Sequence, residues 1–186
     1  AEVENLYGKS IVLRSGATAN NIYGGNVVID NQPAEDEPDI SKEGSYTLST
    51  SNPYYAEGEK TAAYEICEEL QWHATDRIIV PMGHGEQLFM IWKGIKELEE
   101  IGLIKRHDVA MTGVQVESYA TIVDQLHSGK VVEAPADMAR TVATDLAMKK
   151  PTHEYLAIHC IRESKGEGVK VSDVEVLDAM AFLART

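Results

Sequence analysis

A short glycine-rich segment is the part of this sequence best suited to bind a ligand. It reads Gly83-His84-Gly85-Glu86-Gln87 and follows an apolar run that ends in Val80-Pro81. Two glycines in three positions let the backbone bend sharply and approach a ligand closely. A helix is expected to begin at about Gln87, and the free N–H groups and positive dipole end of its first turn attract anions. The segment is therefore predicted to bind an anion, with phosphate as the first candidate.

Taken alone, this segment leaves an alternative open, because both glycines can serve only a tight turn between a strand and a helix. The pattern matches neither the Rossmann fingerprint nor the Gly-Lys-Ser/Thr of a nucleotide-binding P-loop. Glu86 opposes phosphate binding, since a carboxylate repels a dianion unless it points away or is protonated. His84 could donate to a phosphate or exchange a proton near neutral pH. The other histidines are expected to be surface or structural residues: His73, His107, His127, His153 and His159.

The elements that must position this segment alternate along the chain. Short apolar, β-branched runs predict strands at 9–13, 26–29, 46–50, 76–80, 109–116 and 168–171. Apolar residues at helical spacing predict helices at 57–71, 88–98, 119–127 and 154–163. Strands separated by helices indicate βαβ units, so the expected fold is α/β, with three layers and a mostly parallel sheet covered by helices. In such a sheet the ligand lies at the carboxyl ends of the strands.

The end of the sequence predicts one further helix. Ser172-Asp-Val-Glu175 has the pattern of a capping box, in which serine and glutamate satisfy the first free N–H groups of a helix. The apolar residues that follow are expected to face inward: Val176, Leu177, Met180 and Leu183. Cys67 and Cys160 are expected to be buried small hydrophobic residues on helices, because two cysteines cannot form a disulfide framework.

Composition limits the classes of partner. The chain has 186 residues, with 17 Lys or Arg and 30 Asp or Glu, giving a formal net charge of -13. This acidic excess disfavours nucleic acid and anionic membranes as partners. The acidic, proline-containing stretch 30–39 is expected to be a solvated loop, and no metal site is predicted. No apolar run approaches the roughly 20 residues that span a bilayer. With no secretory signal pattern at the start, a cytoplasmic location is expected.

Several motifs resemble one enzyme family. The runs Ser51-Asn-Pro-Tyr-Tyr-Ala-Glu-Gly and Asp76-Arg-Ile-Ile-Val-Pro-Met-Gly-His-Gly-Glu-Gln are similar to those of threonine synthases, pyridoxal-phosphate enzymes of fold type II. The similarity continues through Gly113-Val-Gln-Val-Glu117 and Val171-Ser-Asp-Val-Glu175. The resemblance implies conversion of O-phosphohomoserine and water into threonine and phosphate with pyridoxal phosphate as cofactor. It also implies that Gly83, His84, Gly85, Glu86 and Gln87 hold the cofactor phosphate.

The sequence also departs from that family. The family's loop is commonly Gly-Asn-Gly-Gly-Asn, so His84, Glu86 and Gln87 are substitutions. No Ser-Phe-Lys-Asp type motif, which carries the Schiff-base lysine, occurs here, and a replacement role for Lys60, Lys93 or Lys96 is less expected than a solvated position. The chain is therefore expected to be a fragment or an inactive relative.

The resemblance also predicts how the chain is organised. Residues 1–44 are expected to be a remnant of the small domain plus the acidic loop, and residues 45–186 an α/β domain that carries the phosphate loop. The alternative function is a non-catalytic binding module, or a partner subunit, for a small phosphorylated metabolite. A homodimer is expected because dimers are usual in the family.

Overall fold

The computed structural model describes residues 10–13, 25–29, 46–48, 53–73, 75–105, 108–134 and 140–185. The chain divides into two compact units, Ala1–Tyr55 and Ala56–Thr186. The acidic stretch 30–39 lies outside the described residues. The domain boundary expected after residue 44 stays a prediction.

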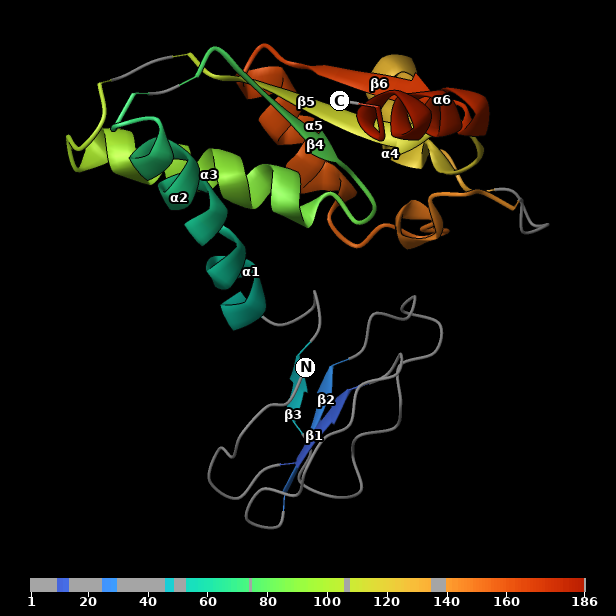
Figure 1. The fold of residues 1–186 in the computed structure, drawn as a ribbon, viewed down its shortest axis with the longest axis horizontal. Helices are drawn as coiled ribbons and strands as arrows, with labels where there is room; N and C mark the ends of the chain where they lie inside the picture. Colours follow the sequence, from blue (N-terminus) through green and yellow to red (C-terminus); the bar gives the residue numbers. More distant parts are fainter. Residues whose placement is uncertain are drawn as a thin grey trace. The chain divides into compact units, whose positions relative to one another are not determined.

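The first unit contains a parallel sheet of three strands (Figure 1). These are β1 (Ser10–Leu13), β2 (Gly25–Ile29) and β3 (Tyr46–Leu48), in the order β1-β2-β3. All three were predicted from β-branched runs between turn residues, and the structure confirms them within a few residues.

The second unit is built on a second parallel sheet. Its strands are β4 (Arg77–Pro81), β5 (Ala110–Val116) and β6 (Glu167–Val171), in the order β4-β5-β6. Val80 pairs with Gly113, which pairs with Gly168 in turn. Parallel neighbours need a crossover between them, and the helices that follow β4 and β5 supply it. The predicted α/β class and parallel sheet are confirmed.

Three helices pack against this sheet and form most of the core with it. They are α3 (Glu86–Glu100), α4 (Thr121–Ser128) and α5 (Glu154–Glu163), and α5 contacts both of the others. The predicted apolar stripe of α3 is confirmed, since Leu88, Ile91, Ile95 and Leu98 are all buried. Both cysteines are buried and free, as expected. Because β4 and α3 share this core, the turn between them is held at both ends.

The predicted single helix at 57–71 is wrong. The structure has two helices, α1 (Pro53–Glu59) and α2 (Thr61–Glu69), with a break at Lys60. Proline is favoured at the first helical position, which explains the earlier start at Pro53. The hydroxyl of Thr61 donates to the carbonyl of Gly58 at 2.8 Å, and this contact takes up a carbonyl group at the end of α1.

The last helix, α6 (Asp173–Leu183), confirms one prediction and overturns another. The capping box is present, with the Glu175 N–H donating to Ser172 Oγ at 3.3 Å and the Ser172 N–H donating to Glu175 Oε2 at 2.8 Å. The expected inward residues are not buried, and Leu177, Met180 and Leu183 are 50%, 59% and 69% exposed. Local capping fixes where a helix starts, whereas burial requires a partner surface, and no described element buries a residue of α6.

The second unit also contains two short 3-10 turns, η3 (Glu117–Tyr119) and η4 (Thr144–Leu146). Within the described ranges, none of the helices is long and apolar enough to cross a membrane.

Candidate functional site

The predicted loop joins the end of β4 to the start of α3. Gly85 is the N-cap of α3 and has the left-handed conformation, with φ at 88°. A Cβ atom at this position would lie 2.7 Å from Cβ of Ala157. Gly85 is therefore required both by its backbone angle and by the close approach of α5.

The loop is held in place by the segment that precedes α5. The backbone N–H of His153 donates to the carbonyl of His84 at 3.1 Å. Oγ1 of Thr152 lies 3.1 Å from Nδ1 of His84 and 2.9 Å from Nδ1 of His153. A Cβ atom added to Gly83 would lie 3.2 Å from Met148. These contacts hold the loop against residues 145–157.

The first turn of α3 offers backbone donors. An α-helix leaves its first four N–H groups without partners inside the helix. No side chain caps this end, because the N-cap is a glycine. Gln87, in the first turn, is exposed. The geometry can therefore present N–H groups and the positive end of the helix dipole to an anion.

Glu86 differs from the other loop residues because its side chain is almost fully buried, with 2% exposed. Neither of its carboxyl oxygens has a hydrogen-bond partner among the described residues. Burial, together with the smaller effect of the negative charge of Glu59, raises the pKa of Glu86 to about 7. Only the ionised form of Glu86 repels a phosphate, and at neutral pH about half of the side chain is protonated.

His153 was expected to be a surface or structural residue, and the structure places it, partly buried, against the loop. Its Nε2 atom lies 3.9 Å from Oε1 of Glu86. Burial lowers the pKa values of His153 and His84, and for His84 the charge of His153 adds to this effect. Nothing in the spacing of residues 84 and 153 predicts this contact, because it depends on how α5 packs against α3.

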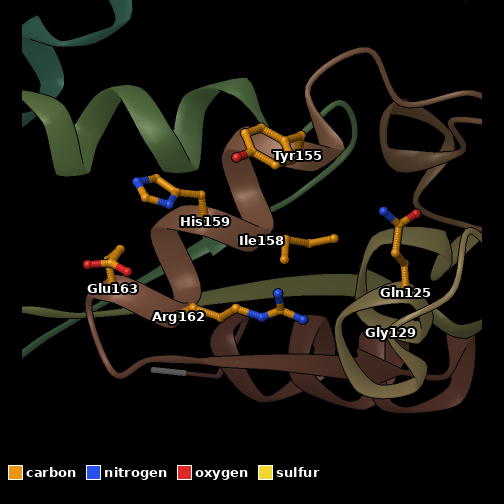
Figure 2. A pocket seen from close by; sticks show the side chains of 7 residues that line it. All are labelled: Gln125, Gly129, Tyr155, Ile158, His159, Arg162 and Glu163. Carbon is orange, nitrogen blue, oxygen red and sulfur yellow. The ribbon is translucent and has the colours of Figure 1, made fainter.

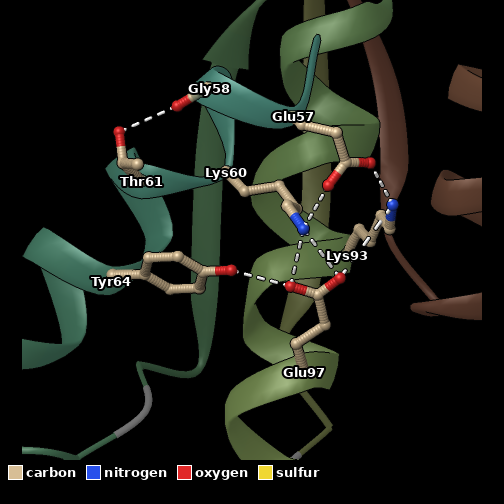
Figure 3. A network of polar contacts seen from close by, with 7 residues as sticks. All are labelled: Glu57, Gly58, Lys60, Thr61, Tyr64, Lys93 and Glu97. Atoms are coloured by element: carbon tan, nitrogen blue, oxygen red, sulfur yellow. Dashed lines mark hydrogen bonds and ion pairs between the residues drawn. The ribbon is translucent and has the colours of Figure 1, made fainter. Parts of the chain in front are cut away.

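A network of ion pairs joins residues of α1, α2 and α3 (Figure 3). The ammonium group of Lys60 donates to both carboxylate oxygens of Glu97 at 2.9 Å and also pairs with Glu57. Lys93 pairs with Glu57 and lies 3.9 Å from Glu97. The hydroxyl of Tyr64 donates to Glu97 at 2.7 Å. These contacts bind both lysines to carboxylates.

These ion pairs bear on whether Lys60, Lys93 or Lys96 replaces the Schiff-base lysine. Hydrogen bonds to Glu57 and then Glu97 raise the pKa of Lys60, which favours the charged, non-nucleophilic amine. Lys96 lies on α3 with its ammonium group 3.0 Å from Glu99. The structure thus gives these lysines structural partners and provides no support for the replacement role.

A separate pocket of about 320 Å³ lies between α4 and α5 (Figure 2). Its lining includes Gln125, His159 and Arg162, but none of residues 83–87. Within the described part of the chain, no group of His, Cys, Asp and Glu side chains is arranged to hold a metal ion.

Comparison with known proteins assigns the family. The model of the family described as pyridoxal-phosphate dependent enzyme matches residues 6–186. The chain belongs to the pyridoxal-phosphate-dependent enzyme family. The resemblance to threonine synthases is also confirmed. Threonine synthase of Methanocaldococcus jannaschii is 36% identical over 140 residues, covering 75% of this chain and 34% of that protein.

A second relative agrees with the first. Threonine synthase of Methanosarcina acetivorans is 37% identical over 145 residues, covering 78% of this chain and 36% of that protein. This member of the pyridoxal-phosphate-dependent family thus spans about a third of the length of these curated relatives.

Solved structures confirm the fold. Maize serine racemase matches with a TM-score of 0.59 at 19% identity, covering 76% of this chain and 39% of that one. A threonine deaminase from T.th. matches with a TM-score of 0.58 at 19% identity, covering 77% of this chain and 50% of that one. The expected fold, part of a fold type II pyridoxal-phosphate enzyme, is therefore confirmed.

Proposed function

We propose that this chain provides the phosphate-binding loop of a threonine synthase-like enzyme that converts O-phosphohomoserine and water into threonine and phosphate. Gly83, His84, Gly85, Glu86 and Gln87 would hold the phosphate group of pyridoxal phosphate. The observation that carries the proposal is the glycine N-cap of α3, in the left-handed conformation and without a side-chain cap, directly after a parallel strand.

The residues present fit a bound phosphate in three respects. Backbone N–H groups of the first turn of α3 supply donors, and the helix dipole favours the negative charge. Gly83 and Gly85 pack closely against the 145–157 segment, so a side chain at either position would crowd that segment. The side chain of Glu86 is buried, and neither of its carboxyl oxygens accepts a hydrogen bond from a described residue, so it does not occupy these donors. When bound, pyridoxal phosphate supplies an electron sink, while the protein positions it.

The expected partners follow from the same site. The net charge of -13 opposes a general attraction of anions, so an anion must be bound by the local backbone geometry of the loop. A small phosphorylated metabolite fits such a site. Two free, buried cysteines accord with a reducing, cytoplasmic location. A homodimer is proposed on the family resemblance alone.

The loop can be tested by removing one backbone donor. Gln87→Pro deletes the N–H of a first-turn residue, where proline costs no intrahelical hydrogen bond. Gln87→Ala keeps the N–H and serves as the matched control. Charge-assisted hydrogen bonds contribute roughly 1.5–3 kcal/mol, so we expect Gln87→Pro to weaken binding of pyridoxal phosphate at least about tenfold. Calorimetry with pyridoxal phosphate and with inorganic phosphate measures the effect.

Thermal unfolding of both variants shows whether α3 is intact. Equal affinity of the two variants, with both folded, would contradict the assignment of the loop. Binding of inorganic phosphate without preference for pyridoxal phosphate would instead support the non-catalytic metabolite-binding alternative.

A further inference from the structure

The loop contains a buried titratable group that phosphate binding alone does not require. Glu86 is 2% exposed, and neither carboxyl oxygen has a hydrogen-bond partner among the described residues. Two titratable side chains act on it or lie close to it, Glu59 at the end of α1 and His153 before α5, and His84 stands two residues before it in the loop. One oxygen of Glu59 is also buried without a partner among those residues. A negative charge on Glu86 is therefore uncompensated.

None of these neighbours can neutralise Glu86 at neutral pH. Burial lowers the pKa values of both histidines, so the imidazole 3.9 Å from Glu86 is neutral there. Glu154 acts on His153 in the opposite direction, as the smaller effect. Burial also raises the pKa of Glu59. The remaining way to remove the charge is a proton on Glu86 itself.

We propose that binding of a phosphate dianion at residues 83–87 is coupled to uptake of one proton by Glu86. Glu86 is the first residue of α3, so the bound anion and the carboxyl group share the same helix end. An ionised Glu86 would repel the dianion in a poorly solvated environment, where charge interactions are strong. The protonated form removes that repulsion, and the loop then binds anions more tightly at lower pH. This inference rests on the proposed function of the loop.

Inorganic sulfate is a suitable probe, because it stays a dianion from pH 6.5 to 8.5 and any proton taken up belongs to the protein. Chemical-shift titration of the Gly83 and Gly85 amides measures the affinity at both pH values. With a Glu86 pKa of about 7 and binding by the protonated form alone, linkage predicts affinity about 25-fold weaker at pH 8.5 than at pH 6.5. The carboxyl carbon shift of Glu86 should titrate at higher pH when sulfate is present.

Glu86→Gln keeps the shape and removes the titration, so its affinity should change less than about threefold over the same range. Glu97→Gln, on the same helix, is the matched control and should keep the full pH dependence of sulfate affinity.

Sulfate binding with the same affinity at both pH values in the natural chain would overturn the coupling and leave the loop assignment intact. Absence of amide shifts in both the natural chain and Glu86→Gln would overturn the loop assignment as well. An unshifted Glu86 titration on sulfate binding would also refute the coupling, even if Glu86→Gln failed to fold.

Discussion

Helix α3 carries two acidic residues whose surroundings are opposite. At its start, Glu86 is buried, has no hydrogen-bond partner among the described residues, and has its pKa raised to about 7. Three turns later, Glu97 is half-buried and accepts hydrogen bonds from Lys60 and Tyr64, which lower its pKa. The two residues have the same chemistry and lie on the same helix.

The difference shows that pairing, and not helix position alone, sets the charge of these carboxylates. The helix dipole favours a negative charge at the N-terminus, where Glu86 lies. Burial outweighs that preference there, because desolvation penalises the ionised form strongly. Glu97, further from the dipole's positive end, stays ionised because a lysine and a tyrosine donate to it. A buried carboxyl group without a partner, such as Glu86, can change its protonation when a ligand binds. A paired carboxylate such as Glu97 stays charged and stabilises the fold.

The largest effect is expected from Glu86→Gln. The folded pKa of Glu86 lies above its ordinary value of 4.5, so the folded state binds more protons than the unfolded state between about pH 4.5 and 7. The natural chain should therefore lose stability as pH rises through this window. A displacement of this size corresponds to about 3 kcal/mol. Glu86→Gln should lack that loss, and urea unfolding at pH 4, 6 and 8 measures it.

Glu97→Gln provides the control with the opposite sign. The lowered pKa of Glu97 means that its contribution is present above its ordinary pKa and is lost as pH falls. The stability difference between this variant and the natural chain should therefore shrink in acid. A parallel pH dependence of the two variants would contradict the contrast between the two ends of α3.

A smaller effect is expected from breaking the ion-pair network. Lys60→Met leaves Glu57 and Glu97 with only Lys93 between them. Exposed ion pairs contribute roughly 0–1 kcal/mol each, and the Lys60 side chain is only 12% exposed, so a loss of about 1 kcal/mol is expected. The loss should diminish in 1 M salt, because salt screens the pairs. Thermal unfolding at low and high salt tests this, and a loss unaffected by salt would indicate packing instead.

How much of this was predictable depends on whether local chemistry or tertiary contact decides each feature. Gly85 as the entry to α3 and the capping box at Ser172 follow from residue type over a few positions, and both were predicted. The break at Lys60 was missed because the apolar residues that indicated this helix all lie after it and carry no information on residues 57–60. The exposure of Leu177 was missed because burial depends on a partner surface that periodicity does not reveal.

The candidate site divides in the same way. The loop residues stand next to one another in the sequence, so their common position was predictable. His153 joins them from a distant part of the chain, through the packing of α5 against α3. The raised pKa of Glu86 depends on burial and on Glu59, which belongs to another helix. The sequence alone therefore indicated an anion loop but gave no indication of its buried acid.

The smallest expected effect separates hydrogen bonding from charge within the network. Tyr64→Phe removes the hydroxyl group that donates to Glu97 at 2.7 Å and leaves the lysine pairs unchanged. A hydrogen bond at a partly exposed site contributes roughly 0.5–1.5 kcal/mol, and a value near the lower end is expected here, since water can replace the donor. Because the hydroxyl is neutral, this loss of stability should be the same in 1 M salt, unlike that of Lys60→Met.

Lys60 lowers the pKa of Glu97 more than Tyr64 does. Carboxyl carbon titration should therefore show a smaller rise in the pKa of Glu97 for Tyr64→Phe than for Lys60→Met. The reverse order would mean that the tyrosine, and not the lysine, keeps Glu97 ionised.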